Sequence, residues 1–374
     1  MKIVVNTRLL LKNKLEGIGW FTYENFKRIV LAHPEHEFYF LFDRKYSDEF
    51  IFAENVHPIV LFPPSRHPLL WIIWFEYSVP RILKKLKPDL FISPDGYISL
   101  RTDVPQLAVI HDINFYHRPL DLPWSSRLYY RYYFPRFAHK AKRIVTVSEF
   151  SKQDICDSYY ISPDKVDVVY NGANSEYRPL TQEEIKATQK KYSFGYDYFL
   201  FVGSLHPRKN VSGLLNAFDH FIYRYGTDHK VVIVGEKMFF TSDLDLTYNQ
   251  MTFGDDVIFT GRLDTTELKF VLGAATAMVF VPFFEGFGIP IVEAMYAGVP
   301  VIASNTTAIP EVAGDAALFV DPAKMEEIAE AMHKISVDPE LRKSLIEKGQ
   351  MQCHKYSWDI AAEKLWKSIE KCLS

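Results

Sequence analysis

The sequence has few cysteines, no long apolar run and almost no excess of charge. Its three cysteines, Cys156, Cys353 and Cys372, are far apart and form no Cys-x-x-Cys pair, which is typical of a reducing compartment. No segment reaches the roughly 20 consecutive apolar residues of a membrane-spanning helix. The first residues, MKIVVN, become polar too soon for a secretory signal peptide. We therefore expect a cytoplasmic protein.

Two further absences exclude classes of ligand. The net charge is only −3, which argues against bulk binding of nucleic acid. No Gly-x-Gly-x-x-Gly fingerprint follows the first apolar segment, which argues against a dinucleotide-dependent oxidoreductase. The Asp-x-Asp of Asp243 and Asp245 follows Thr241 and Ser242, where helix capping explains it better than a metal. We expect neither a metal nor a resident cofactor.

Short apolar segments alternate with longer amphipathic ones along the whole chain. Strands are predicted at residues 2–6, 37–42, 59–62, 90–93, 107–110, 143–147, 166–170, 198–202, 230–234, 257–260, 277–281, 299–303 and 317–320. Helices are predicted at residues 20–32, 69–87, 125–140, 149–159, 211–224, 265–275, 290–297, 325–337, 339–354 and 357–373. Buried strands separated by helices favour parallel sheets covered on both faces, and hence an α/β fold.

The length predicts about two domains. The segment NGANSEYRPL, residues 171–180, interrupts the alternation with turn formers and a proline, and we place the linker there. The prediction is two Rossmann-like, doubly wound domains, residues 1–175 and 176–356, facing across a cleft. Ligands of such folds bind at the carboxyl ends of the strands.

Residues 285–293, EGFGIPIVE, place two carboxylates eight positions apart around a Gly-x-Gly turn. The turn follows an apolar strand and opens a helix, so its backbone N–H groups and the helix dipole favour an anion. Glu285 lies in the turn and Glu293 in the helix, a geometry that suits a nucleotide sugar. The alternative is an ordinary strand–turn–helix connection with a capping glutamate.

A second motif follows the strand at 198–202, where Gly203 and Ser204 lead into LHPRKN and another helix. Arg208 and Lys209 are adjacent cations just after a strand, and a guanidinium fork beside a lysine is suited to a diphosphate. The alternative for this motif is a solvated basic loop.

The first half offers two weaker signals. Gly17 and Gly19 follow the first strand and precede an amphipathic helix, where a plain turn and a ligand contact are equally consistent with the sequence. His111 and Asp112 follow the strand at 107–110, and a histidine there is suited to proton transfer. Its alternative is a structural histidine bonded to the neighbouring carboxylate. His33-Pro34-Glu35-His36 has the spacing of metal ligands, but a surface turn explains it better.

In this order, the motifs resemble the retaining GT-B glycosyltransferases of family 4 along essentially the whole chain. The segments that carry the resemblance are GIG (17–19), VIHD (109–112), TVSEFS (146–151), VYNG (169–172), VGSLHPRKN (202–210), TGRL (260–263), EGFGIPIVE (285–293) and YSW (356–358). The finer resemblance is to members that transfer mannose from GDP-mannose onto bacterial polysaccharides.

The resemblance implies roles for the matching positions. Arg208 and Lys209 would bind the donor diphosphate, and Glu285 would touch the hydroxyls of the transferred sugar near the anomeric carbon. The implied roles of the other donor-site residues are ribose binding by Glu293, backbone contacts to the diphosphate within Gly286, Phe287, Gly288 and Ile289, and contact with the base by Arg262 and Leu263.

On the acceptor side, the resemblance places His111 near the reacting centre and Gly17 and Gly19 in a loop that approaches phosphate and acceptor. Many members carry an arginine where this chain has Ser204, so one phosphate contact is missing or supplied elsewhere. The C-terminal helix, residues 357–374, would cross back onto the first domain.

The aromatic-rich helices at 69–77 and 128–137 leave two interpretations open. They either pack on the sheet or at a dimer contact, or dock on the inner face of a membrane and deliver a lipid-linked acceptor.

The sequence thus predicts a metal-free, retaining glycosyltransferase that moves a hexose from a nucleotide sugar to a glycan or lipid-linked acceptor. Its alternatives are another GT-B enzyme, such as a UDP-sugar epimerase or glycan phosphorylase, or a non-catalytic scaffold that binds sugar nucleotides.

Overall fold

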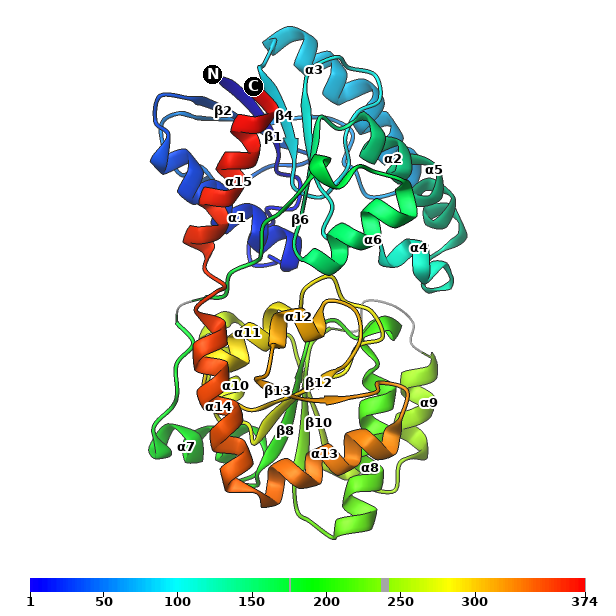
Figure 1. The fold of residues 1–374 in the computed structure, drawn as a ribbon, viewed down its shortest axis with the longest axis vertical. Helices are drawn as coiled ribbons and strands as arrows, with labels where there is room; N and C mark the ends of the chain where they lie inside the picture. Colours follow the sequence, from blue (N-terminus) through cyan, green and yellow to red (C-terminus); the bar gives the residue numbers. More distant parts are fainter. Residues whose placement is uncertain (175, 237–241, 374) are drawn as a thin grey trace. The chain divides into compact units, whose positions relative to one another are not determined.

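The computed structural model describes residues 1–174, 176–236 and 242–373, which form two compact α/β units (Figure 1). Unit 1 contains residues 1–172 and 357–374, and unit 2 contains residues 173–356. Each unit is built on one sheet whose paired strands are all parallel. Among the described residues, no helix is long and apolar enough to cross a bilayer.

The sheet of unit 1 has the strand order β3-β2-β1-β4-β5-β6-β7. Its strands are β1 (Lys2–Asn6), β2 (Glu37–Phe42), β3 (Val56–Val60), β4 (Leu90–Ser93), β5 (Gln106–Val109), β6 (Arg143–Thr146) and β7 (Val166–Val168). Its helices are α1 (Gly17–Ala32), α2 (Pro68–Ile73), the π-helix η2 (Trp74–Ser78), α3 (Val79–Leu86), α4 (Asn114–His117), α5 (Trp124–Lys140), α6 (Glu149–Tyr159) and α15 (Trp358–Leu373).

Helices cover both faces of this sheet because its buried strands are apolar on both sides. Helices α1 and α15 pack together on one face, whereas α2, α3, α5 and α6 lie on the other (Figure 1). The second face holds an aromatic core in which Trp74, Phe91 and Phe137 are fully buried.

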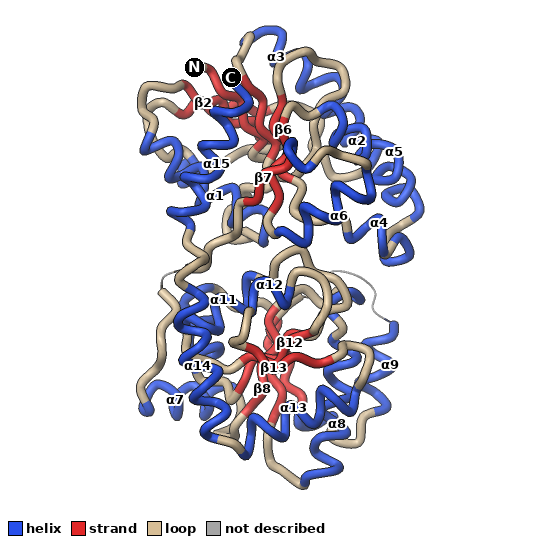
Figure 2. The backbone as a smooth tube through the Cα atoms, in the orientation of Figure 1, coloured by secondary structure: helices blue, strands red, loops and turns tan. Residues whose placement is uncertain are grey.

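The sheet of unit 2 has the order β10-β9-β8-β11-β12-β13, and helices surround it (Figure 2). Its strands are β8 (Tyr198–Val202), β9 (Lys230–Val234), β10 (Val257–Gly261), β11 (Ala277–Phe280), β12 (Val301–Ser304) and β13 (Ala317–Val320). Its helices are α7 (Gln182–Tyr192), α8 (Val211–Tyr225), α9 (Ser242–Gln250), α10 (Thr265–Gly273), α11 (Ile289–Tyr296), α12 (Ile309–Ala313), α13 (Met325–Val337) and α14 (Pro339–Cys353).

Both sheets are doubly wound, as predicted. Strand order reverses between β1 and β4 in unit 1 and between β8 and β11 in unit 2. At such a point two loops leave the carboxyl ends of neighbouring strands in opposite directions, which opens a place for a ligand.

Candidate active site

The reversal point of unit 2 brings the two predicted donor motifs together. β8 leads into the turn that carries Arg208 and Lys209, and its neighbour β11 leads into the loop that carries Glu285. Some 76 residues separate Lys209 from Glu285 in sequence, and only the pairing of β8 with β11 makes them neighbours.

Glu285 is paired with both cations. Arg208 Nη1 donates to Glu285 Oε2 at 2.7 Å, and Lys209 Nζ forms an ion pair with the same oxygen. Burial by itself would raise the pKa of Glu285, but Lys209 and then Arg208 more than offset it and lower the pKa to about 2. The carboxylate therefore stays ionised at working pH. Two cations around one carboxylate leave an excess positive charge that favours an anionic ligand.

Asn210 fixes the turn that carries the cations. It has a left-handed φ of +59°, which asparagine tolerates better than most residues. Its side-chain amide donates to the carbonyl of Val281 at 3.1 Å and to that of Pro322 at 2.7 Å. The N–H of Phe283 also donates to the carbonyl of Arg208 at 2.8 Å, so the loops after β8 and β11 are tied together.

Thr307, which the sequence did not single out, holds the backbone of Glu285 from the loop after β12. Its hydroxyl accepts a hydrogen bond from the N–H of Glu285 at 3.2 Å and donates to the carbonyl of Thr306 at 2.7 Å. Thr307 has a φ of +57°, which is unusual for a β-branched residue. Such backbone strain concentrates at functional sites.

We expect Thr307→Gly to lower kcat several-fold without lowering the melting temperature. Glycine relieves the left-handed strain, worth about 1 kcal/mol, but removes the hydroxyl that holds Glu285. Thr307→Ser keeps the hydroxyl and serves as the control, with near wild-type kcat. Equal kcat for the glycine and serine variants would show that the hydroxyl does not position Glu285.

The N-terminus of α11 forms the other wall of this site. Gly288, at a φ of +98°, caps the helix, and a Cβ there would lie 3.1 Å from Ile309 Cδ1. As a glycine, Gly288 has no side chain that could cap the helix, and no acidic residue lies in its first turn, so the backbone dipoles favour an anion. The predicted backbone contacts all fall in this turn or at the first helical residue: Gly286, Phe287, Gly288 and Ile289.

Glu293 lies in the second turn of α11 and is partly buried. Burial raises the pKa of its carboxyl to about 7, although a hydrogen bond from the Tyr177 hydroxyl acts in the opposite direction. Tyr177 comes from the segment that the sequence predicted only as a linker. A partly buried carboxyl with one protein partner retains capacity to accept hydroxyl groups of a ligand.

The remaining predicted donor residues lie along the same edge of the sheet. Ser204 is in the loop after β8, before the cations. Arg262 and Leu263 follow β10, which is separated from β8 by β9.

His111 lies in unit 1, beyond the carboxyl end of β5. Its Nε2 donates to the carbonyl of Pro94 at 2.8 Å, which leaves Nδ1 as the acceptor nitrogen of the neutral ring. Burial lowers the pKa of His111, and its ring packs edge-on against Phe21. The sequence alternative paired this histidine with Asp112; the hydrogen bond that the structure gives His111 is to Pro94, and Asp112 Oδ1 accepts from Asn114.

Gly17 and Gly19 lie in the first turn of α1, whereas the sequence predicted that this helix begins at residue 20. A Cβ on Gly19 would lie 3.0 Å from the carbonyl oxygen of Leu9, so local packing explains this glycine. A Cβ on Gly17 would meet no atom within 4 Å. Gly17 is exposed and the helix has no side-chain cap, so this end remains suited to an anionic group.

A buried polar cluster at the reversal point of unit 1 escaped the sequence analysis. Arg8 Nε pairs with Asp95 Oδ2 at 2.5 Å, and Asn6 Nδ2 donates to Asp95 Oδ1 at 2.8 Å. The Arg8 guanidinium also lies 4.3 Å from the ring centroid of Tyr97. Buried ion pairs seldom add net stability, so this cluster is more consistent with a role in function or in specifying a unique fold. The sequence feature that could have revealed this cluster is the polar residues directly after the strands at 2–6 and 90–93.

Within the described ranges, one group of three residues could converge on a metal: His33, Glu35 and His36. They form a turn between α1 and β2, as predicted. The rings of His33 and His36 stack on Trp366 of α15, so packing accounts for both histidines.

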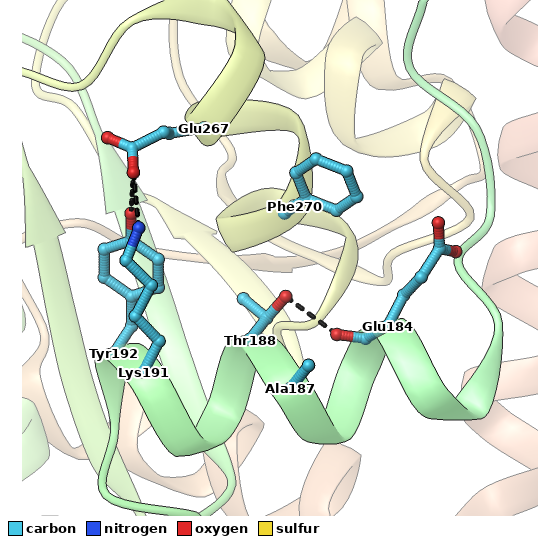
Figure 3. Close-up of a pocket in the computed structure, with 7 residues that line it drawn as sticks. All are labelled: Glu184, Ala187, Thr188, Lys191, Tyr192, Glu267 and Phe270. Atoms are coloured by element: carbon cyan, nitrogen blue, oxygen red, sulfur yellow. Dashed lines mark hydrogen bonds and ion pairs between the residues drawn. The ribbon is translucent and has the colours of Figure 1, made fainter.

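A surface pocket between α7 and α10 contains none of the predicted residues (Figure 3). Its polar groups are already paired, since Glu267 binds Lys191 and the hydroxyl of Tyr192. The Thr188 hydroxyl donates to the carbonyl of Glu184 at 2.8 Å. We therefore assign the active site to the Glu285 cluster and not to this pocket.

Comparison with known families agrees with this geometry. Residues 182–352 match the model of glycosyl transferases group 1, and residues 30–177 match that of glycosyltransferase family 4. The chain belongs to the GT-B glycosyltransferases. The first match contains the whole Glu285 cluster and the second contains His111.

Similar proteins support the assignment. The chain is 28% identical over 371 residues to the O-antigen chain mannosyltransferase B of Escherichia coli, covering 96% of this chain and 97% of the relative. It is also 28% identical over 258 residues to the O-antigen chain mannosyltransferase RfbU of Salmonella typhimurium, covering 68% and 67%.

Two solved structures share the fold of this glycosyltransferase. WaaG, a glycosyltransferase involved in lipopolysaccharide biosynthesis, superposes with a TM-score of 0.78 at 14% identity, covering 97% of this chain and 98% of WaaG. Anabaena HepE, crystallised with UDP and glucose, gives 0.77 at 15% identity and 99% coverage of both chains.

Proposed function

We propose that this glycosyltransferase transfers mannose from GDP-mannose, with retention of configuration, to a glycan or lipid-linked acceptor in cell-surface polysaccharide synthesis. The observation that carries the proposal is the pairing of Glu285 with Arg208 and Lys209 in the loops that lead to the N-terminus of α11, whose N-cap residue is glycine. The names of the two mannosyltransferase relatives support the choice of sugar and pathway.

In this mechanism the donor diphosphate lies against Arg208, Lys209 and the start of α11. These groups offset the charge that develops as the bond between the sugar C1 and the phosphate oxygen breaks. The acceptor oxygen forms the new bond to C1, and its proton passes to the leaving phosphate.

Glu285 accepts hydroxyl groups of the transferred sugar. With a pKa near 2 it is a weak base and no proton donor, which disfavours a role as general acid or general base. Glu293 accepts the ribose hydroxyls. His111 of unit 1 is neutral, and its Nδ1 is suited to accept a hydrogen bond from a substrate hydroxyl.

The proposal is tested by thermal shift and transfer assays with GDP-mannose, UDP-glucose, UDP-N-acetylglucosamine, GDP, UDP and NAD. A shift with GDP-mannose and GDP that is unchanged by EDTA is expected, because binding to the native state raises the melting temperature. NMR of the product should show the α-anomer. No change in melting temperature with any sugar nucleotide, or a change with NAD alone, would contradict the proposal. Epimerised free sugar or phosphorolysis of a glycan would instead favour the alternative GT-B enzymes.

Lys209→Ala is expected to weaken binding of GDP at least tenfold and to leave binding of guanosine nearly unchanged. The reason is that, in the proposed complex, the ammonium binds the diphosphate and no part of the nucleoside, and a charge-assisted hydrogen bond contributes about 1.5–3 kcal/mol. Titration calorimetry with both ligands measures the difference. Lys190→Ala, an exposed lysine of α7, is the control. An equal loss for GDP and guanosine would place Lys209 away from the phosphates.

A further inference from the structure

The loop after β4 holds His111 through its backbone. Residues Ser93 to Gly96 form a tight turn in which the N–H of Gly96 donates to the carbonyl of Ser93 at 3.2 Å. The turn presents the carbonyl of Pro94 to His111 Nε2 at 2.8 Å, and this is the hydrogen bond that the structure gives the ring. The position of this one carbonyl therefore decides which ring nitrogen carries the proton.

The same turn is fixed by the carboxylate of Asp95. Its Oδ1 accepts from the amide of Asn6 at 2.8 Å, from the hydroxyl of Ser93 at 2.9 Å and from the N–H of Tyr97 at 3.3 Å. Its Oδ2 accepts from Arg8 Nε at 2.5 Å. Both oxygens of this buried carboxylate are thus satisfied, so the carboxylate ties the turn to the end of β1.

Arg8 is itself held from other sides. Its Nη1 donates to the carbonyl and the hydroxyl of Ser65 at 3.3 and 3.2 Å, and the hydroxyl of Ser65 donates to Asp43 at 2.9 Å. The guanidinium also packs against the ring of Tyr97. Arg8 and Asp95 are 6% and 8% exposed, so water has little access to the pair. A change in either charge is therefore transmitted to the turn and is not screened by solvent.

We propose that Arg8 and Asp95 are positioning residues for the transfer reaction. They hold the turn after β4 in place, and the turn holds His111 in the tautomer whose Nδ1 accepts a hydrogen bond. The catalytic consequence rests on the proposed function, in which Nδ1 accepts from a substrate hydroxyl, whereas the tautomer itself does not depend on it. A role in specifying the fold is the competing explanation, because a buried polar pair can also select one packing of the core.

The first test observes the tautomer in the full chain at pH 7.5. The protein is labelled with ¹⁵N-histidine, and the His111 signals are those that disappear in His111→Gln. Wild type should give two well-separated ring-nitrogen shifts, as one fixed tautomer does, because burial lowers the pKa of His111 and keeps its ring neutral. In Asp95→Asn the two shifts should move towards each other as the second tautomer becomes populated. Asp167→Asn is the matched control: it breaks a partly buried pair with Arg143 in the same unit and should keep the wild-type shifts.

The second test asks whether the pair acts through His111. Asp95→Asn is expected to lower kcat by about tenfold to a hundredfold, since a displacement of about 1 Å in a positioned group has effects of this size. The KM for the donor should change by less than about twofold, because the donor-binding residues lie in unit 2. In the His111→Gln background the same substitution should lower kcat by less than about twofold, because the side chain that it positions is already gone. Asp167→Asn should leave kcat and KM at wild-type values.

A milder variant addresses the case in which Asp95→Asn does not fold, since a buried cation that loses its partner is strongly destabilising. Arg8→Lys keeps the charge but replaces the guanidinium by an ammonium, which cannot bond Asp95 and Ser65 with the same geometry. It should give a smaller change in the His111 shifts and a smaller loss of kcat, and this loss should also vanish in the His111→Gln background. Melting curves show which variants fold.

A wild-type tautomer in the folded variants, or two exchanging tautomers in wild type, would overturn the proposal. Losses of kcat that multiply in the double variant would also overturn it and would leave the pair with a structural role. The NMR result needs neither donor nor turnover. The expected tautomer response in a protein that does not transfer mannose would therefore count against the proposed donor and leave the positioning role intact. The kinetic test would then use the sugar nucleotide that wild type does transfer.

Discussion

Replacing Glu285 by glutamine is expected to lower kcat about a thousandfold or more while GDP binds at least as tightly as it does to wild type. The amide keeps the shape but removes the charge that accepts sugar hydroxyls in the transition state, and losses of this size follow from removing one such group. Arg208 and Lys209 then lose their counterion, so the diphosphate meets less competition for them.

The same substitution, Glu285→Gln, is expected to make the ligand-free protein less stable. Two largely buried cations that lose the Glu285 carboxylate lower the free energy of unfolding by about 3 kcal/mol, and GDP should restore much of it. Single-turnover transfer, GDP titration and melting curves with and without GDP measure the three effects. Glu267→Gln, which breaks an exposed pair with Lys191 in the same unit, is the control. A variant that transfers at near wild-type rate would remove Glu285 from the mechanism.

Replacing Glu293 by glutamine is expected to stabilise the free protein at pH 8 and to weaken donor binding. The pKa of Glu293 is raised to about 7 in the folded chain from 4.5. Folding therefore favours the protonated form. Below a pH of about 4.5, ionisation of Glu293 costs the native state no stability. This loss of unfolding free energy grows as the pH rises from about 4.5 to 7, and it is complete above that.

The penalty that glutamine removes is on the order of 2 kcal/mol at pH 8 and close to zero at pH 4.5. Denaturant unfolding at both pH values measures it. The same titration predicts that wild type binds GDP-mannose more tightly at pH 8 than at pH 5.5, since the proposed role of the carboxylate is to accept the ribose hydroxyls. Tyr177→Phe, which removes only the hydroxyl bond, should keep this pH dependence. A variant that binds the donor as wild type does at pH 8 would contradict the ribose role.

Strand positions were predicted closely because buried parallel strands are short apolar runs that stand out in sequence. One strand was misplaced: β3 spans Val56–Val60, not 59–62, because an edge strand tolerates Pro58 and His57. The prediction missed α7 although its sequence signal, a capping box of Thr181 and Glu184, is present. The single helix expected at 69–87 is divided by the π-helix η2.

The sequence by itself determined the two doubly wound sheets and the residue types of the donor site. The spacing of apolar residues and the glycine turn of residues 285–293 reflect local backbone preferences. These preferences depend on neighbouring residues in the chain and not on long-range contacts. Tertiary structure alone decided which of these residues meet. The pairing of β8 with β11 unites Glu285 with Arg208 and Lys209, and the left-handed loop after β12 adds Thr307. The cluster of Asn6, Arg8 and Asp95 likewise exists only because β1 pairs with β4. Such contacts depend on strand order, which no local pattern in the chain encodes.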